Sequence, residues 1–134
     1  MKLLLDTHLL LWALLDSPQL PLQARTLILD QANSIHYSVA SLWEVQIKHD
    51  AHPDRMLVGA QALARYCRQA GFLPLPIAER HIVALGSLSR VAGAPPHKDP
   101  FDRIMICQAK VDGLVLLTHD GLLAGYGEPC VLTV

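Results

Sequence analysis

The sequence lacks the features that mark several large classes of protein. Its apolar runs are short, and none approaches the roughly 20 residues that cross a bilayer. Only 17% of its 134 residues are charged and the net charge is −1, so there is no overall basic surface for a nucleic acid. Hydrophobic residues make up 51% of the chain, which argues against disorder. We expect one domain over residues 1–134, with any nucleic-acid contact confined to a local patch.

Cysteine is scarce as well. Cys67, Cys107 and Cys130 lie far apart, no pair has the spacing of zinc ligands or of a redox motif, and an odd number argues against a disulfide framework. The apolar start of the chain superficially resembles an export signal, but Asp6 interrupts it and no small-residue cleavage site follows. We therefore expect reduced cysteines in a cytoplasmic protein that makes no membrane contact.

Short apolar runs alternate with segments of helical spacing along the chain. The predicted strands are Lys2–Leu5, Ile35–Tyr37, Leu73–Leu75, Val115–Leu117 and Cys130–Thr133. The predicted helices are Leu9–Leu15, Leu22–Gln31, Ser38 to about Lys48, Met56 to Gly71, a stripe of Ala78, Ile82 and Leu85, and Asp99 to Gly113, with loops at His49–Asp54 and Ser89–Pro96. The alternation predicts an α/β fold with a mostly parallel sheet and helices on both of its faces.

Four acidic residues fall at one edge of this predicted sheet. Asp6 follows the first strand directly, and Asp120 follows Val115–Leu117 after a Thr-His pair. Glu44 lies little more than one turn inside the helix that begins at the second strand, and Asp102 lies in the first turn of the last long helix. Because parallel α/β sheets bind ligands outside the carboxyl ends of their strands, these acids are candidates for a shared site.

Carboxylates that converge on one cleft repel one another and raise each other's pKa values, and a divalent cation removes that repulsion. A set of oxygen ligands favours Mg²⁺ or Mn²⁺ over zinc. Such a cation polarises a phosphodiester and activates a bound water. Since no serine or cysteine nucleophile constellation accompanies the acids, they point to metal-assisted hydrolysis of a phosphate ester.

Each acid also has a purely structural interpretation. Asp99 is also explained as a helix cap, and Asp102 as a favourable charge in the first turn of that helix. Asp120 stands before a glycine, a pair that is common in turns. Glu44 fits a solvated helix position. Asp6 is the hardest to explain in this way, because a carboxylate at the end of an apolar strand needs a specific reason to be there.

The same residues carry a resemblance to a subgroup of VapC-type PIN domains. Four segments resemble that family's motifs in family order: Leu4–Trp12, Ser38–Val45, His97–Ala109 and Leu117–Asp120. The third segment is long and distinctive, and together the four span nearly the whole chain. Two segments depart from the family pattern: Ser89–Pro96 is longer than the usual connection, and His49–Asp54 replaces a stretch that is commonly helical.

The resemblance implies a three-layer αβα fold and the toxin of a toxin–antitoxin pair, a ribonuclease that depends on Mg²⁺ or Mn²⁺. It also implies a cognate antitoxin protein and a homodimer as partners. It assigns the catalytic, metal-binding role to Asp6, Glu44, Asp102 and Asp120. The alternative is a PIN-like module that binds RNA or protein without cleaving. A phosphatase of the haloacid dehalogenase type is disfavoured, because His8 stands where its second acid belongs.

Several polar residues are candidates for supporting roles. Thr118 is placed to donate a hydrogen bond to Asp6 or to a metal-bound water. Arg103 is placed to form an ion pair with Asp99 or to reach a phosphate, and we favour the ion pair. The candidates for a positive rim that contacts RNA, each also explained as solvated surface, are Lys48, His97, Lys98 and His119.

Apolar helical surroundings favour a core position for three aromatic residues rather than a role in base stacking: Trp12, Trp43 and Phe101. His8 is not expected to bind metal, because a residue at the start of a helix turns away quickly. The segment Leu9–Leu15 is apolar on every side, so we expect it to contribute to a partner-facing surface as well as to the core.

Overall fold

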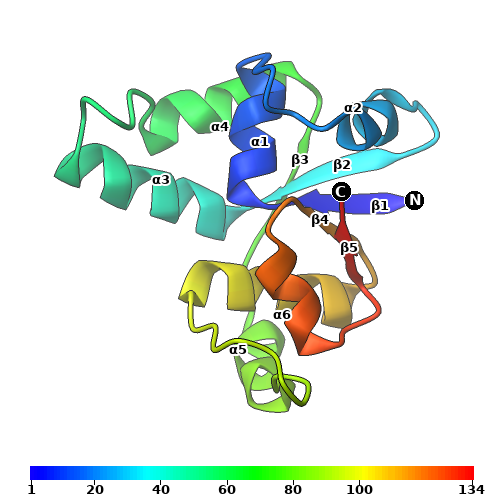
Figure 1. Cartoon of the computed structure of the whole chain (residues 1–134). Helices are drawn as coiled ribbons and strands as arrows, with labels where there is room; N and C mark the ends of the chain where they lie inside the picture. Colours follow the sequence, from blue (N-terminus) through cyan, green and yellow to red (C-terminus); the bar gives the residue numbers. More distant parts are fainter.

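A computed structural model describes residues 1–134, and its centre is a sheet of five parallel strands in the order β3-β2-β1-β4-β5 (Figure 1). The strands are β1 (Lys2–Leu5), β2 (Ser34–Ser38), β3 (Leu73–Leu75), β4 (Val115–Thr118) and β5 (Val131–Thr133). All five predicted strands are present. The fold class is confirmed, and the sheet is parallel throughout rather than mostly parallel.

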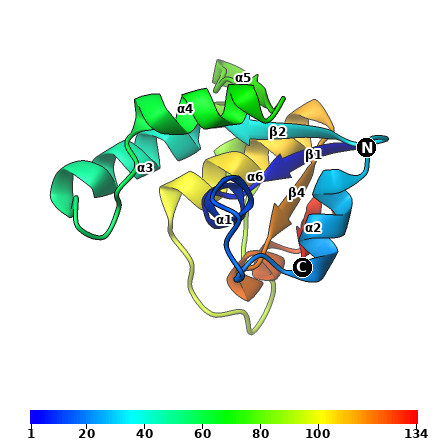
Figure 2. The ribbon, with the colours of Figure 1, turned by 90° about the horizontal axis from the view of Figure 1, so that it is seen from above.

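Helices cover both faces of the sheet, which gives the three-layer αβα arrangement (Figures 1 and 2). They are α1 (Thr7–Leu14), α2 (Leu22–Leu29), α3 (Val39–Ala51), α4 (Ala60–Gln69), α5 (Glu79–Ala84), α6 (Pro100–Asp112) and two 3₁₀ helices, η1 (Leu85–Ser87) and η2 (Gly121–Tyr126). The protein has two hydrophobic cores, one on each face of the sheet, because successive side chains of a strand point to opposite faces. In β1, Leu3 and Leu5 pack with α1, α2 and α4, whereas Leu4 packs with α6 and η2.

Short polar side chains set the starts of three helices next to the strand ends. Asp6 caps α1, Ser38 caps α3 and Asp99 caps α6, each by accepting a hydrogen bond from a backbone N–H of the first turn. Helix α6 ends at Gly113, whose φ of 73° is a left-handed conformation that glycine adopts without strain. These caps fix where the chain turns from strand to helix at the carboxyl edge of the sheet.

Some predicted boundaries were wrong. Helix α3 continues to Ala51, so the first part of the predicted loop His49–Asp54 is helical. Its last turn carries Lys48 and His49, which favour a helix C-terminus, and the Gln46 amide donates to Asp50 Oδ1 at 2.8 Å across one turn. Helix η2 was not predicted, because its sequence has no clear helical period.

Three further findings complete the fold. Helix α5 is held against α6 by Arg80, which donates two hydrogen bonds to Asp112, at 2.9 and 3.0 Å.

The cysteines are free: Cys67 and Cys107 are buried, and Cys130 is half-buried. No helix has the length and hydropathy needed to cross a membrane.

Candidate active site

The first acid of the predicted site, Asp6, lies between the two central strands. It follows β1, and its backbone N–H continues the sheet by donating to Leu117 O at 3.0 Å. Asp6 is only 3% exposed; its carboxylate Oδ1 accepts from the Leu9 N–H at 2.8 Å, and Oδ2 accepts from the Thr118 hydroxyl at 2.6 Å. Burial raises the Asp6 pKa, while these two hydrogen bonds oppose the rise by favouring the ionised form. The predicted contact of Thr118 with Asp6 is present.

Glu44 and Asp120 differ in their exposure and in their partners. Glu44 lies on α3 and is 5% exposed, and the Lys48 ammonium one turn later contacts its Oε2 at 2.5 Å. Asp120 follows β4 and is exposed; it caps η2 by accepting from the Leu122 N–H at 2.9 Å. One of these acids is therefore paired with a cation, and the other is open to solvent.

Asp102 is the acid with the most perturbed environment. It lies in the first turn of α6, and its pKa is raised to about 7, first by burial and then by repulsion from Asp99, Asp6, Glu44 and Asp120. Because the charges of the other three predicted acids all raise the pKa of Asp102, the four carboxylates interact electrostatically. A divalent cation would relieve that repulsion, so the residues present fit a metal of the kind that oxygen ligands prefer.

Buried hydrogen bonds below the acids tie the surrounding elements together. The Thr7 and Ser41 hydroxyls join α1 to α3 at 2.9 Å. The Ser38 hydroxyl donates to Gln108 Oε1 at 2.6 Å, joining the end of β2 to α6, and the Gln108 amide donates to the Leu75 carbonyl at 3.2 Å. Helix α3, which carries Glu44, is thus joined to the start of α1 beside Asp6, and α6, which carries Asp102, is joined to the ends of β2 and β3.

The structure does not place His97 on an exposed rim. Its side chain is 6% exposed; Nε2 lies 3.1 Å from Asp102 Oδ2, and Nδ1 lies 2.8 Å from the Tyr126 hydroxyl. His97, Asp102 and Asp120 each offer one ligand atom, and the three atoms lie within 4.8 Å of one another. Sequence reasoning missed this position, although His97 stands only five residues before Asp102 in the third motif.

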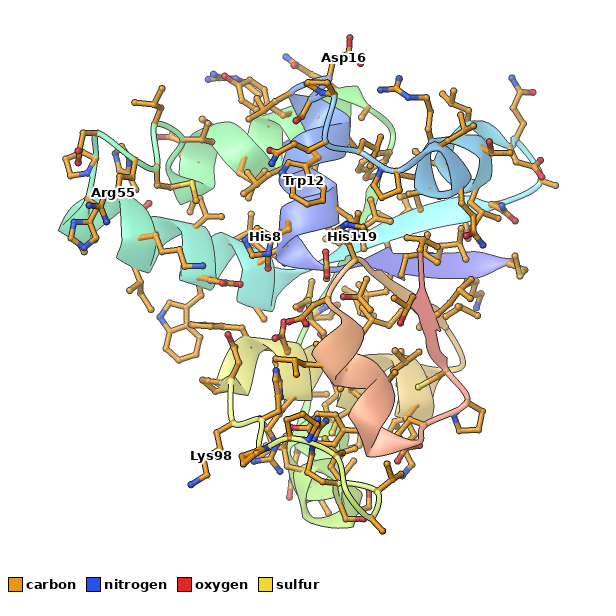
Figure 3. The ribbon with its side chains drawn as sticks, viewed as in Figure 1. His8, Trp12, Asp16, Arg55, Lys98 and His119 are labelled. Carbon is orange, nitrogen blue, oxygen red and sulfur yellow. The ribbon has the colours of Figure 1, made fainter.

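A small cavity of about 230 Å³ opens beside Asp6 and Asp120. Its other walls are His8 and Trp12 of α1 and His119, which follows β4; the three side chains lie close together (Figure 3). The Trp12 ring centroid lies 5.9 Å from that of His8 and 5.8 Å from that of His119. Trp12 is half-buried: it packs against the core, as predicted, and it also lines the cavity, which was not predicted.

The predicted core position of Trp43 is wrong: it is 63% exposed and packs edge-on against Phe101, which is half-buried, with centroids 5.3 Å apart. Trp43 was misassigned because α3 turns this face of its sequence outward. Arg103 forms no pair with Asp99; its guanidinium donates instead to the Leu85 carbonyl at 3.4 Å.

The remaining predicted rim residues occupy different environments. Lys48 is engaged with Glu44, and His119 contacts the Val134 carbonyl through Nδ1 at 2.5 Å. Lys98 extends into solvent, away from the cavity walls (Figure 3). The rim is therefore not one continuous basic patch.

Comparison with known proteins agrees with this architecture. No curated protein matches the sequence. Among solved structures, the chain is similar to one described as VapBC2 from Rickettsia felis bound to a DNA fragment from their promoter, with a TM-score of 0.69, 15% identity, and coverage of 100% of this chain and 98% of that one. At this identity the likeness shows the fold alone. The sequence model of the PIN domain matches residues 3–128, nearly the whole chain, and the protein therefore belongs to the PIN-domain family.

Proposed function

We propose that this protein is an endoribonuclease, dependent on Mg²⁺ or Mn²⁺, that acts as the VapC-type toxin of a toxin–antitoxin pair. One observation carries the proposal: ligand atoms of Asp102 and Asp120 lie within 4.8 Å of each other, and Asp120 lines one cavity with Asp6. The rise that Asp6, Glu44 and Asp120 cause in the pKa of Asp102 supports it. Such an arrangement is costly without a cation and useful with one.

Each acid has a distinct part in this proposal. A divalent cation held by the four acids would supply Lewis-acid polarisation of the phosphodiester and a bound water of lowered pKa. The Thr118 hydroxyl and the Leu9 N–H hold Asp6 in one rotamer and favour its ionised form, against the effect of burial. Lys48 holds Glu44 in place. Asp120 is exposed, and this leaves its carboxylate accessible to a substrate-bound ion.

The cavity beside the acids supports a nucleic-acid substrate. Trp12, His8 and His119 present aromatic surface next to Asp6, and stacking on aromatic side chains is a general way to bind unpaired bases. The phosphate that follows such a base would lie near the carboxylates. The proposed substrate is therefore RNA with unpaired nucleotides rather than a regular duplex.

The partners belong to the proposal as well. The protein whose fold this chain shares is described as part of a VapBC complex, and this supports a cognate antitoxin here. An apolar groove of about 460 Å³ lies at the C-terminal ends of α1, α2 and α4, and a second chain would cover it. The first part of α1, in contrast, is buried in the core. We propose a homodimer, formed in the cytoplasm, in which residues 1–134 make one PIN domain.

The test is cleavage of single-stranded and structured RNA with added Mg²⁺ or Mn²⁺, with EDTA as the blank. We expect metal-dependent cleavage by the wild type and a loss of several orders of magnitude in Asp6→Asn, because the amide keeps the shape and removes the charge. Sequencing RNA ends after induced expression of both forms would identify the substrate.

Two other amide variants serve as controls. Asp16 is exposed, with a φ of 50° that asparagine also tolerates, so Asp16→Asn should cleave normally. Asp99→Asn should retain most activity, because asparagine still caps α6. If the wild type binds RNA but cleaves none with either metal, the protein is instead a PIN-like binding module without nuclease activity.

A further inference from the structure

His97 faces the acids in a fixed orientation. Its ring is nearly fully buried, with Nε2 3.1 Å from Asp102 Oδ2 and Nδ1 2.8 Å from the Tyr126 hydroxyl oxygen. Each ring nitrogen therefore has one polar contact. A metal site made of the four acids alone assigns no role to this histidine.

The Tyr126 hydroxyl determines which nitrogen carries the hydrogen. It lies 3.0 Å from the His97 backbone carbonyl, which can only accept, so the tyrosine donates its one hydrogen there. Its oxygen must then accept from Nδ1–H. In the neutral imidazole this leaves the lone pair on Nε2, and that lone pair points toward Asp102 Oδ2.

Two electron-rich atoms that face each other at this distance need a positive centre between them. A proton can lie on the line between them, whereas a metal ion would lie to one side of that line, with the two atoms as neighbouring ligands. Neighbouring ligands of an octahedral ion with bonds of about 2.1 Å are about 3.0 Å apart, close to the observed 3.1 Å between His97 Nε2 and Asp102 Oδ2. A ligand atom of Asp120 completes a group of three within 4.8 Å.

The surroundings of Tyr126 keep this arrangement rigid. The Arg90 guanidinium lies 4.5 Å from the centre of the Tyr126 ring, and it donates to the Pro95 carbonyl at 2.9 Å and the Leu122 carbonyl at 2.8 Å. The long segment Ser89–Pro96 is thereby fastened across η2. Metal-bound histidines characteristically have their other ring nitrogen fixed by such a hydrogen bond.

From this geometry we propose that His97 binds the catalytic cation directly through Nε2, together with Asp102 and Asp120. The inference rests on the proposed metal-dependent function and adds a nitrogen to a ligand set that the acids alone would make all oxygen. Imidazole is a better ligand for Mn²⁺ and the later first-row metals than for Mg²⁺. The site should therefore prefer Mn²⁺ to Mg²⁺ more strongly than an all-carboxylate site does.

The experiment is electron spin echo envelope modulation of Mn²⁺ bound to the full chain. We expect modulation from a directly bound ¹⁴N in the wild type, and its replacement by a ¹⁵N pattern when the histidines are labelled with ¹⁵N, which needs no mutation. His97→Gln should remove the modulation and weaken Mn²⁺ binding at least tenfold while changing Mg²⁺ binding less. His119→Gln is the matched control, since it removes another histidine of the same cleft and should leave the modulation intact.

Each outcome has a definite meaning. Bound Mn²⁺ without nitrogen modulation, or modulation that persists in His97→Gln, would overturn the proposal and show His97 to be a hydrogen-bonding neighbour of Asp102. If His97→Gln fails to fold, Tyr126→Phe should keep the fold and reduce the modulation by freeing the ring. RNA cleavage that proceeds without nitrogen modulation would leave the nuclease proposal standing, whereas nitrogen modulation without cleavage would support the ligand and contradict the nuclease. Absence of Mn²⁺ binding would contradict both.

Discussion

The two sides of the acidic cleft are built in different ways. On one side, Asp6 is held by groups of regular elements: the Leu9 N–H of α1 and the Thr118 hydroxyl at the end of β4. On the other side, Asp102 is contacted by His97, which is held in turn by Tyr126 from η2 and lies beyond the irregular segment Ser89–Pro96. Burial raises the pKa of both carboxylates; two hydrogen bonds oppose the rise at Asp6, whereas repulsion from the other acids adds to it at Asp102, whose pKa reaches about 7.

This difference predicts that the two sides of the cleft respond differently to changes in their surroundings. A strand end gives a carboxylate a precise and rigid position, because the backbone around it is fixed by the sheet. A carboxylate that begins a helix next to a loop depends on the loop for its neighbours. We therefore expect the Asp6 side to be robust to changes in the loops, and the Asp102 side to be sensitive to metal, to pH and to the packing of residues 89–98.

The largest effect should come from a test of whether the two sides act as one unit. Asp6→Asn and Asp102→Asn should each reduce metal-dependent RNA cleavage by several orders of magnitude. The double variant should be little worse than either single one, because residues that act together are grossly non-additive. The measurement is the cleavage rate of all four forms on one RNA at saturating Mn²⁺. Multiplicative losses in the double variant would show that the two sides work independently.

A smaller effect should appear in the stability of the metal-free protein. Because the folded pKa of Asp102 lies near 7 and its ordinary value is 3.8, the folded state binds this proton more tightly than the unfolded state. The stabilisation is complete below about pH 4 and is lost as the pH rises through 7. Relative to Asp102→Asn, the wild type should lose on the order of 2 kcal/mol of unfolding free energy between pH 5 and pH 8.

Urea unfolding of both forms in EDTA across this pH range measures that difference. The comparison with Asp102→Asn subtracts the contributions of Asp6 and of the histidines, which both forms share. Saturating Mn²⁺ should flatten the wild-type curve, because the cation holds the carboxylate ionised at every pH. Parallel curves for the two metal-free forms would mean that neither burial nor the neighbouring acids raise the pKa of Asp102.

The same contrast explains how much the sequence could predict. Asp6 and Asp120 were placed next to each other because each lies just after a central strand, and strand ends in a parallel sheet meet; Glu44 was placed from its position in the second turn of the helix that follows β2. His97 was placed wrongly, since a loop residue next to a lysine carries no periodic signal that distinguishes a buried ring from a solvated one. Trp43 was placed wrongly for a related reason: an apolar residue in a helix is expected to face the core, and nothing local shows which face the neighbouring helix leaves open. Local patterns determined the strands, caps and acids, whereas contacts between distant irregular segments determined what surrounds them.

The smallest effect should come from loosening the Asp102 side without touching any acid. Gly125 lies in η2 directly under Arg90, and a Cβ there would fall 2.3 Å from the Arg90 Nη2 atom. In Gly125→Ala the guanidinium must move, so its hydrogen bonds to the Pro95 and Leu122 carbonyls weaken and Tyr126 loses its stacked neighbour. We expect a loss of about 1 kcal/mol in unfolding free energy and a few-fold weaker affinity for Mn²⁺, because the ring of His97 is less well held. Gly86→Ala is the matched control, since it also changes a glycine of a 3₁₀ helix but its Cβ would meet nothing within 4 Å. Calorimetric titration with Mn²⁺ alongside urea unfolding separates the two effects. If Gly125→Ala loses stability but binds Mn²⁺ as tightly as Gly86→Ala, the segment Ser89–Pro96 supports the fold and not the metal site, and the two sides of the cleft differ less than their structures suggest.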